Sequence, residues 1–169
     1  KTGHALTFTL DHSKGANQKT AGDILDSQGT WNAGLLRTKK RAMATLERAD
    51  KAIAELGAGV PFLIVYYGSD GSGGWQTLDR PLRTLTTLDR FGLVEWDDGK
   101  PTLRMLQVPE LRRAMGLTKG FKLSHGSRRN RVRILGNGVC PPVMKAIIKS
   151  LKAGAENTSH GVSLPIAAE

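Results

Sequence analysis

The sequence predicts a mixed α and β (α+β) chain, in which helices flank a β-rich domain. Three patterns indicate this class. Residues 38–56 carry apolar side chains at every third or fourth position, residues 60–67 form a continuous apolar run, and residues 141–152 return to helical spacing. With 169 residues, the chain is long enough to bury a hydrophobic core.

The first third is expected to connect and support the rest. The segment ALTFTL at 5–10 alternates apolar and hydroxyl side chains, which predicts a short strand. Residues 11–34 are rich in Gly, Asn, Ser and Thr and predict a loop region, with a short element at 24–26. An amphipathic helix follows at 38–56. We therefore interpret 1–57 as a connecting segment that ends in a helix.

The middle of the chain predicts strands and turns. The run VPFLIVYY at 60–67 is typical of a strand buried on both faces, and the Gly-rich stretch 68–75 predicts a loop of the kind that carries binding contacts. The turn residues at 96–99 predict a hairpin that returns through 102–106. A short helix is expected at 109–116, with Pro near its start and Gly as its stop.

These elements divide the rest of the chain into three parts. We expect a β-rich domain over 58–118, a basic segment with a C-terminal helix over 119–154, and a small, polar tail without regular structure over 155–169. The C-terminal helix carries a wide apolar stripe, which needs a surface to cover it. The stripe consists of Val143, Met144, Ile147, Ile148 and Leu151.

The formal net charge of +10 is concentrated in one region. Residues 100–152 contain 13 Lys or Arg and one acid, Glu110, whereas the remainder holds 12 basic and 14 acidic residues. The densest part, residues 118–135, has six Lys or Arg and no acid. A surface of one sign repels itself unless a polyanion lies beside it, and nucleic acid is the commonest polyanion. The alternative is a solvated basic face that serves solubility.

The sequence also argues against a membrane span, a signal peptide, an internal disulfide and a metal site. No stretch approaches the roughly 18 apolar residues of a membrane span, and the start of the sequence does not resemble a signal peptide. A single cysteine, Cys140, excludes an internal disulfide, and the four His have no partners at metal-ligand spacing. We interpret Cys140 as a small buried hydrophobe and LGNGV at 135–139 as a tight turn. By itself, the composition indicates a nucleic-acid-binding protein without a visible catalytic centre.

Two segments carry residues at the spacing of a known family. RMLQVPELRRAMGL at 104–117 places Arg, Leu, Glu, Arg and Gly in order, and RVRILGNGVCPPVMKAI at 131–147 contains Gly-Asn-Gly-Val before Pro-Pro. They resemble the ninth and tenth motifs of the bacterial and phage cytosine-5 DNA methyltransferases, although Gln107 stands where the ninth motif usually has Thr. Residues 61–94 look like the target-recognition region of one branch of these enzymes. The resemblance covers about residues 20–150.

The resemblance implies part of an enzyme. In the family the C-terminal helix packs on a Rossmann-like methyltransferase domain, a thiolate adds to C6 of a flipped cytosine, and C5 receives the methyl group of S-adenosylmethionine. The family's Pro-Cys, Glu-Asn-Val and Phe-x-Gly-x-Gly motifs do not occur in this sequence. Cys140 occupies a tenth-motif position and cannot take the nucleophile's role. We therefore expect a C-terminal fragment or small subunit that has no catalytic residues and is inactive alone.

Site residues follow from the same resemblance. Direct readout in the major groove and contacts with the phosphates would come from residues of the recognition region and the basic segment. The expected DNA-binding residues are Ser69, Asp70, Gly71, Arg83, Thr84, Thr86, Arg90, Lys122, Arg128 and Arg129. Thr84-Leu85 could be the family's Thr-Leu pair, although Thr86-Thr87 leaves the register open and β-propensity explains these threonines equally well. The residues expected to line the S-adenosylmethionine pocket are Asn137, Gly138 and Val139. No metal site is expected.

The implied partners are double-stranded DNA and a catalytic domain or large subunit. In isolation the chain is expected to form a homodimer, to swap its C-terminal helix or to leave it poorly ordered. We expect no membrane partner and a cytoplasmic, nucleoid-associated bacterial protein that acts in DNA methylation or restriction–modification. Arg104, Glu110 and Arg113 are expected to organise the recognition domain internally. The rival interpretation is a non-catalytic DNA-binding protein derived from such an enzyme.

Overall fold

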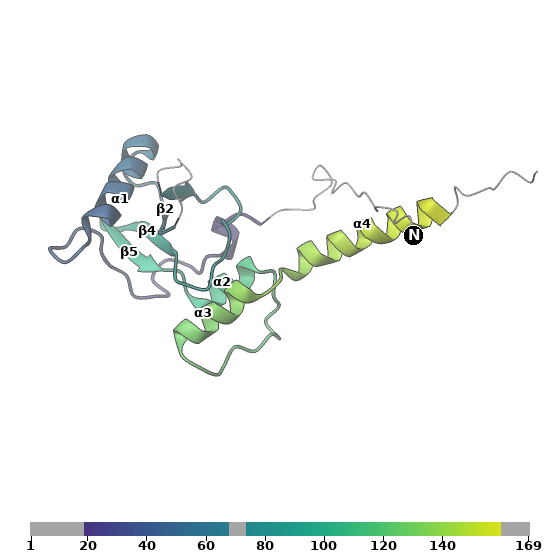
Figure 1. Cartoon of the computed structure of the whole chain (residues 1–169). Coiled ribbons are helices and arrows are strands. Elements are labelled where there is room, and N and C mark those ends of the chain that lie inside the picture. The colour runs from purple at the N-terminus through teal and green to yellow at the C-terminus, as the bar shows by residue number, and fades with distance from the viewer. Residues whose placement is uncertain (1–18, 68–73, 160–169) are drawn as a thin grey trace, which may run out of the picture. The chain divides into compact units, whose positions relative to one another are not determined.

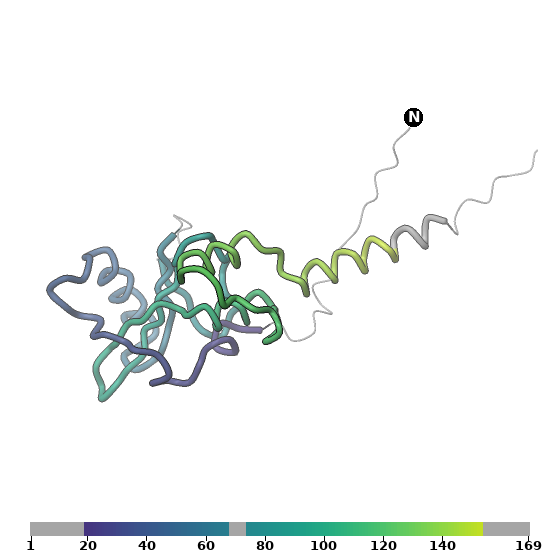
Figure 2. Tube along the Cα trace, turned by 90° about the horizontal axis from the view of Figure 1, so that it is seen from below, coloured from purple at the N-terminus to yellow at the C-terminus, as the bar shows by residue number. Residues whose placement is uncertain are grey.

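The computed structural model describes residues 19–67 and 74–159, and the side chains of 154–159 are left undescribed. The chain divides into two units, which are treated separately below. The compact unit spans 18–138, and the second unit consists of residues 1–17 and 139–169. The strand predicted at 5–10 and most of the Gly-rich loop predicted at 68–75 lie outside the described residues. Figures 1 and 2 give two views of the chain.

A five-stranded antiparallel sheet forms the centre of the compact unit, with strand order β1-β5-β4-β2-β3 (Figure 1). The chain is therefore α+β, as predicted, and β2 is buried along its whole length. The strands are β1 (Gly34–Leu35), β2 (Phe62–Val65), β3 (Trp75–Thr77), β4 (Phe91–Asp97) and β5 (Lys100–Met105). The helices of this unit are α1 (Met43–Leu56), α2 (Val108–Ala114) and α3 (Arg128–Asn137), together with the 3-10 turn η2 (Gly22–Ile24).

The β4–β5 hairpin confirms the prediction from its turn residues. Asp98 and Gly99 both have positive φ, at 47° and 72°, as a tight two-residue hairpin turn requires. Asp97 pairs with Lys100 on either side of the turn. Asp tolerates the left-handed region better than most residues and Gly adopts it freely, so the local sequence specifies this turn without help from the rest of the fold.

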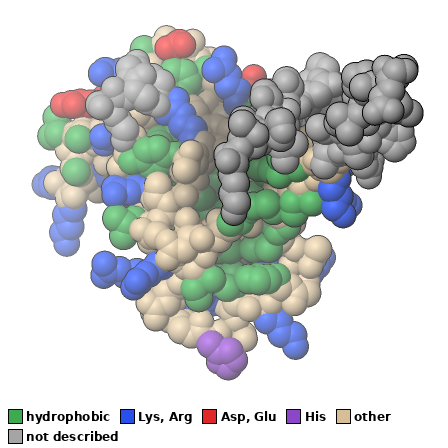
Figure 3. Space-filling model, turned by 45° about the vertical axis from the view of Figure 1, so that its right-hand side comes forward, with side chains coloured by type: hydrophobic (Ala, Val, Ile, Leu, Met, Phe, Trp, Pro, Cys, Tyr) green, Lys and Arg blue, Asp and Glu red, His purple; other side chains and the backbone are tan. Residues whose placement is uncertain are grey.

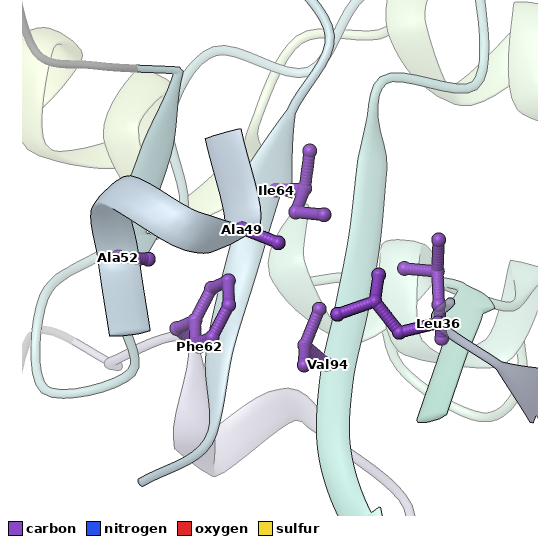
Figure 4. Close-up of a cluster of buried hydrophobic side chains, with 7 residues drawn as sticks. Leu36, Ala49, Ala52, Phe62, Ile64 and Val94 are labelled. Carbon is purple, nitrogen blue, oxygen red and sulfur yellow. The ribbon is translucent and has the colours of Figure 1, made fainter. Parts of the chain in front are cut away.

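Helix α1 covers one face of the sheet. Ala49 and Ala52 of the helix pack on Phe62 and Ile64 of β2 and on Val94 of β4, as Figure 4 shows. Small residues on the helix allow it to lie close to the large side chains of the strands. This cluster forms the main core of the compact unit.

Helix α1 begins five residues later than the predicted start at residue 38. The intervening residues form a turn, in which the Arg41 side chain donates hydrogen bonds to the carbonyls of Leu35 and Leu36 at 3.0 and 3.1 Å. The backbone N–H of Arg41 also bonds to the carbonyl of Thr38 at 3.0 Å. These contacts tie residues 38–42 to β1 and delay the helix.

The opposite face of the sheet is covered by α2, α3 and η2. Leu63, Leu93 and Arg104 lie directly across from one another in the strand register and are buried on this face. Helix α2 contacts both α3 and η2, although η2 precedes it by more than 80 residues (Figure 2). Helix α2 confirms the short helix predicted at 109–116, and Gly116 follows it with a φ of 67°.

Helix α3 is a departure from the sequence prediction. Residues 128–137 were expected to form a basic loop and a tight turn, but they form a helix capped by the Ser127 hydroxyl, which accepts a hydrogen bond from the Asn130 N–H at 3.2 Å. Only Val132 and Leu135 of this helix are buried. Two apolar positions are too few for a clear helical period in the sequence, so packing on the sheet decides the structure.

The compact unit also differs in extent from the predicted domain. It takes in η2, β1 and α1, which the sequence places in a connecting segment, and α3, which the sequence assigns to a separate basic segment. Strand β1 pairs with β5, and α1 contributes core residues, so the predicted 58–118 domain is not complete by itself.

Helix α4 (Pro141–Ser159) forms the described part of the second unit. It confirms the helix predicted from Pro141 and continues through 155–159, which the sequence predicts as part of an irregular tail. Val143 and Ile148 of its apolar stripe are 52% and 46% exposed. The expectation that a further surface covers this stripe stays a prediction. No helix in the described part of the chain is long and apolar enough to cross a membrane.

Candidate nucleic-acid interface

Several of the predicted DNA-binding residues meet where residues 86–90 pack against α3, a region we call the arginine junction. The contact is close because α3 carries Gly136 at this point. A Cβ atom on Gly136 would lie 2.2 Å from the carbonyl oxygen of Thr86 and 2.6 Å from the backbone nitrogen of Thr87. Thr86, Arg90, Arg128 and Arg129 therefore belong to one region, although up to 43 residues separate them in the sequence.

Arg128 is engaged inside the fold. Its guanidinium forms an ion pair with Asp89, and its second terminal nitrogen donates a hydrogen bond to the Leu106 carbonyl at 2.6 Å. The side chain is about one-third exposed. Arg128 therefore links α3 to the end of β5 and to residues 86–90. The structure gives it an internal role, which the sequence did not predict.

Arg90 and Arg129 line a hollow of about 360 Å³ in the arginine junction. Arg90 donates one hydrogen bond, from its terminal nitrogen to the Tyr66 carbonyl at 3.1 Å, while its buried Nε has no partner in the described part of the chain. Arg129 is exposed. A buried donor without a partner carries a desolvation cost. Thr87, Leu88, Asp89 and Val132 complete the lining.

The beginning of α3 favours an anion. Its first turn contains no acid and starts with Arg128 and Arg129, which oppose the helix dipole. The Asp89 carboxylate, which pairs with Arg128, already lies close to this end, and a further anion would interact favourably with the dipole and with the exposed Arg129. In Figure 3, scattered Lys and Arg side chains surround a face that is otherwise largely hydrophobic or uncharged, and the Asp and Glu side chains visible there lie toward its upper part.

Several other residues predicted to bind DNA form hydrogen bonds within the compact unit. The Thr84 carbonyl accepts a hydrogen bond from the Tyr67 hydroxyl at 2.8 Å, and the Thr86 hydroxyl donates to the Leu88 carbonyl at 3.3 Å. The Arg83 N–H donates to the Gln76 side-chain oxygen at 3.2 Å. Lys122 is exposed in the loop between α2 and α3. Ser69, Asp70 and Gly71 lie outside the described residues.

The predicted cofactor residues lie at the boundary between the two units. Asn137 ends α3, Gly138 caps it, and Val139 begins the second unit. All three are exposed. Cys140 follows, half-buried, and its carbonyl accepts the Met144 N–H at 3.1 Å in the first turn of α4. In the described part of the chain, no group of three His, Cys, Asp or Glu is placed to hold a metal ion.

A buried ion pair between Arg104 and Glu110 stabilises the interior of the compact unit. Both carboxylate oxygens of Glu110 accept hydrogen bonds from Arg104 at 2.8 Å. Glu110 is fully buried and also accepts the N–H groups of Gln107 at 2.7 Å and Asp26 at 3.0 Å. All four donors point at one carboxylate, so the pair is fully satisfied.

Arg113 adds further contacts between α2 and residues 24–26. Its guanidinium donates to the Ile24 carbonyl at 2.8 Å and to Asp26 at 2.7 Å, and Asp26 accepts the Trp31 indole N–H at 2.8 Å. These contacts confirm that Arg104, Glu110 and Arg113 organise the domain internally. Asp26 and Asp89 were not predicted as members of such contacts, because their partners lie 87 and 39 residues away.

Glu95 and Arg104 have shifted pKa values. Burial raises the pKa of Glu95, although the Arg104 guanidinium at 3.8 Å acts to lower it. Burial acts to lower the pKa of Arg104, but the hydrogen bond with Glu110 and the surrounding carboxylates outweigh it and raise that pKa. Arg104 therefore stays charged inside the compact unit, whereas ionisation of the Glu95 carboxyl carries a cost in the free energy of unfolding.

This cost predicts a pH-dependent gain in stability for Glu95→Gln. The pKa of Glu95 is higher in the folded than in the unfolded chain, so folding favours the protonated carboxyl. The free energy of unfolding therefore falls as the pH rises from the unfolded pKa through the folded pKa. The variant should be more stable than the parent at pH 7, and the difference should vanish below about pH 4. Urea unfolding at the two pH values measures this. A variant that is less stable at pH 7 would contradict it.

In comparisons with protein-family models, curated proteins and solved structures, the chain has no significant match.

Proposed function

We propose that this chain recognises DNA as the C-terminal part or small subunit of a cytosine-5 DNA methyltransferase, and that Asn137, Gly138 and Val139 complete its S-adenosylmethionine pocket. The observation that carries the DNA-binding part is the arginine junction. There the exposed Arg129 and the half-buried Arg90 line one hollow beside the start of α3, together with Asp89, which pairs with Arg128. These features suit phosphate oxygens, which accept hydrogen bonds and carry negative charge.

The ion pair and hydrogen bonds inside the compact unit also support this proposal. Three of the five residues at ninth-motif positions form or adjoin the buried ion pair that holds α2 against the sheet. Helix α2 in turn contacts α3. A rigid support of this kind suits a binding surface, because side chains held in place lose little freedom on binding.

The division of roles follows from the sequence. The 169 residues contain no Pro-Cys, Glu-Asn-Val or Phe-x-Gly-x-Gly motif, so the nucleophile and most of the cofactor site must come from another polypeptide segment. In this proposal the chain positions the duplex and contributes the edge of the cofactor pocket. The same absence of motifs fits the second candidate equally well, a non-catalytic DNA-binding protein derived from such an enzyme.

Methyl transfer separates the two candidates. We would measure the transfer of labelled methyl groups from S-adenosylmethionine to mixed-sequence duplex DNA, first with this chain alone and then with the polypeptide encoded directly upstream. Activity only in the mixture would support the methyltransferase proposal. DNA binding without methyl transfer in the mixture would favour the non-catalytic protein, and activity of the chain alone would contradict the proposed division of roles.

Arg129→Ala should weaken DNA binding on all sequences alike. Arg129 is exposed at the hollow and has no described internal partner, so its loss removes one phosphate contact. The slope of log K against log salt concentration should fall by about 1. Fluorescence anisotropy with two unrelated duplexes over a salt series measures this, and an effect confined to one duplex would contradict the phosphate role.

Two variants make the Arg129 result specific. Lys40→Ala removes an exposed cation on the turn before α1 and should leave the salt slope nearly unchanged. Arg128→Ala should lower the thermal stability of the compact unit as well as DNA binding, because Asp89 and the Leu106 carbonyl lose their partner. The comparison distinguishes a surface contact from a structural one.

A further inference from the structure

A second hollow lies in the compact unit between α1 and the region that begins with β3. Its volume is about 810 Å³, within the range typical of small-molecule sites. It shares no lining residue with the hollow of the arginine junction. We call it the α1–β3 groove, and its lining consists of Lys51, Ala54, Glu55, Leu56, Trp75, Gln76, Thr77, Arg80, Pro81 and Arg83.

Trp75 provides an aromatic surface in this groove. Its indole is half-buried, and part of it packs against the core beneath α1. In the described part of the chain no acceptor pairs with its indole N–H, in contrast to Trp31, which donates to Asp26. A large aromatic side chain fixed by the core on one side and open to a hollow on the other can stack on a planar ligand at little cost in side-chain entropy.

The groove is also cationic. Lys51 and Arg80 are exposed, and neither pairs with a carboxylate among the described residues. Arg83 lines the groove as well, and among the described residues Glu55 is the acid in its lining. This combination of charge and aromatic surface differs from that of the arginine junction, where none of the described lining residues is aromatic. A ligand that fits both features has a planar group and a negative charge.

The backbone that carries the cations is held in place. Gln76 is 5% exposed, and its side chain donates to the Pro81 carbonyl at 3.1 Å and accepts the Arg83 N–H at 3.2 Å. The carbonyl of Arg80 accepts the Ala21 N–H at 2.7 Å. Residues 80–83 are thus fixed between β3 and the segment before η2. The groove is therefore preorganised, which lowers the entropy cost of binding.

We infer that the α1–β3 groove binds a nucleotide, with the base against Trp75 and the phosphate near Lys51 and Arg80. Base–aromatic stacking and phosphate neutralisation are the two terms by which proteins bind unpaired nucleotides. The chemistry is shared by a free nucleotide and by an unpaired nucleotide of a DNA strand. The inference does not depend on the methyltransferase proposal, because the groove uses none of the residues of the arginine junction.

The test follows the three tryptophan indole N–H signals by NMR during titration. One arm uses thymidine monophosphate, and the other uses a short single-stranded oligothymidylate. The Trp75 signal, assigned by its loss in Trp75→Phe, should shift in at least one arm. A shift in both arms identifies a general nucleotide site, and a shift with the oligonucleotide alone identifies a site for an unpaired strand. No shift of the Trp75 signal in either arm would overturn the inference.

Matched charge variants test the phosphate contact. Lys51→Ala combined with Arg80→Ala should weaken oligothymidylate binding by roughly tenfold. Lys39→Ala combined with Lys40→Ala removes the same charge from the turn before α1 and should leave the affinity nearly unchanged. Equal weakening by both pairs would mean diffuse attraction and would overturn the inference. Arg129→Ala should leave the Trp75 shift intact, so failure of the arginine junction and failure of this groove give different results.

Discussion

Glu110→Gln is expected to lower the free energy of unfolding of the compact unit by about 3–5 kcal/mol, the range measured when one partner of a buried ion pair is removed. Four donors face the Glu110 carboxylate, two from Arg104 and one each from Gln107 and Asp26. A Gln amide would turn N–H groups toward some of these donors and leave the Arg104 guanidinium with the more distant Glu95 carboxylate, at 3.8 Å, as its ion-pair partner. Urea unfolding followed by circular dichroism measures the loss.

Two controls make this result interpretable. Glu47→Gln changes an exposed carboxylate of α1 and should shift the free energy of unfolding by less than about 0.5 kcal/mol. Arg104→Met combined with Glu110→Leu should be less destabilised than Glu110→Gln, because it removes the buried guanidinium together with its partner, although Glu95 loses its ion pair and the Gln107 and Asp26 N–H groups lose their acceptor. If Glu110→Gln unfolds like Glu47→Gln, the buried pair does not hold α2 to the sheet.

Gly136→Ala is expected to destabilise the compact unit by about 3 kcal/mol, at the upper end of the usual cost of overpacking. Helix propensity alone would favour Ala by about 1 kcal/mol at this position. The Cβ, however, would lie 2.2 Å from the Thr86 carbonyl oxygen and 2.6 Å from the Thr87 nitrogen, and both atoms belong to the backbone. Helix α3 must therefore move away from residues 86–90.

The same change should also weaken DNA binding, since it widens the hollow between Arg90 and Arg129. Gly120→Ala is the matched control, because its Cβ would meet only the Thr118 hydroxyl, at 3.6 Å. Thermal unfolding and anisotropy with duplex DNA measure the two effects. A Gly136→Ala variant that is more stable than the parent would show that α3 does not pack closely on this segment.

Local signals in the sequence predicted the elements that local chemistry determines. The β4–β5 turn depends on Asp98 and Gly99, which adopt positive φ readily, and α2 depends on Pro109 and on Glu110 close to its start. The continuous apolar run at 60–67 predicted a strand buried on both faces, and β2 is buried throughout. In each case the signal lies within a few residues of the feature.

Helix α3 and the arginine junction could not be predicted in this way. Val132 and Leu135 are the only buried side chains of α3, so contacts with other elements determine the helix. The Arg128–Asp89 pair joins residues 39 positions apart, and the close approach of α3 at Gly136 is to Thr86 and Thr87, about 50 positions away. The sequence therefore identified Arg128 as a cation in a basic segment but could not distinguish it from Arg129, which is exposed.

The contacts of Arg113 and Glu110 with residues 24–26 set the limits within which this unit could be transplanted. They join residues that are 84 to 89 positions apart, which gives the unit a high contact order. These contacts can form only after α2 has been synthesised. A chimera cut at residue 57 would separate α2 from its partners in the first segment and remove β1 and α1 from the sheet. An exchange of the compact unit between proteins should therefore begin before Lys19 and end after Gly138.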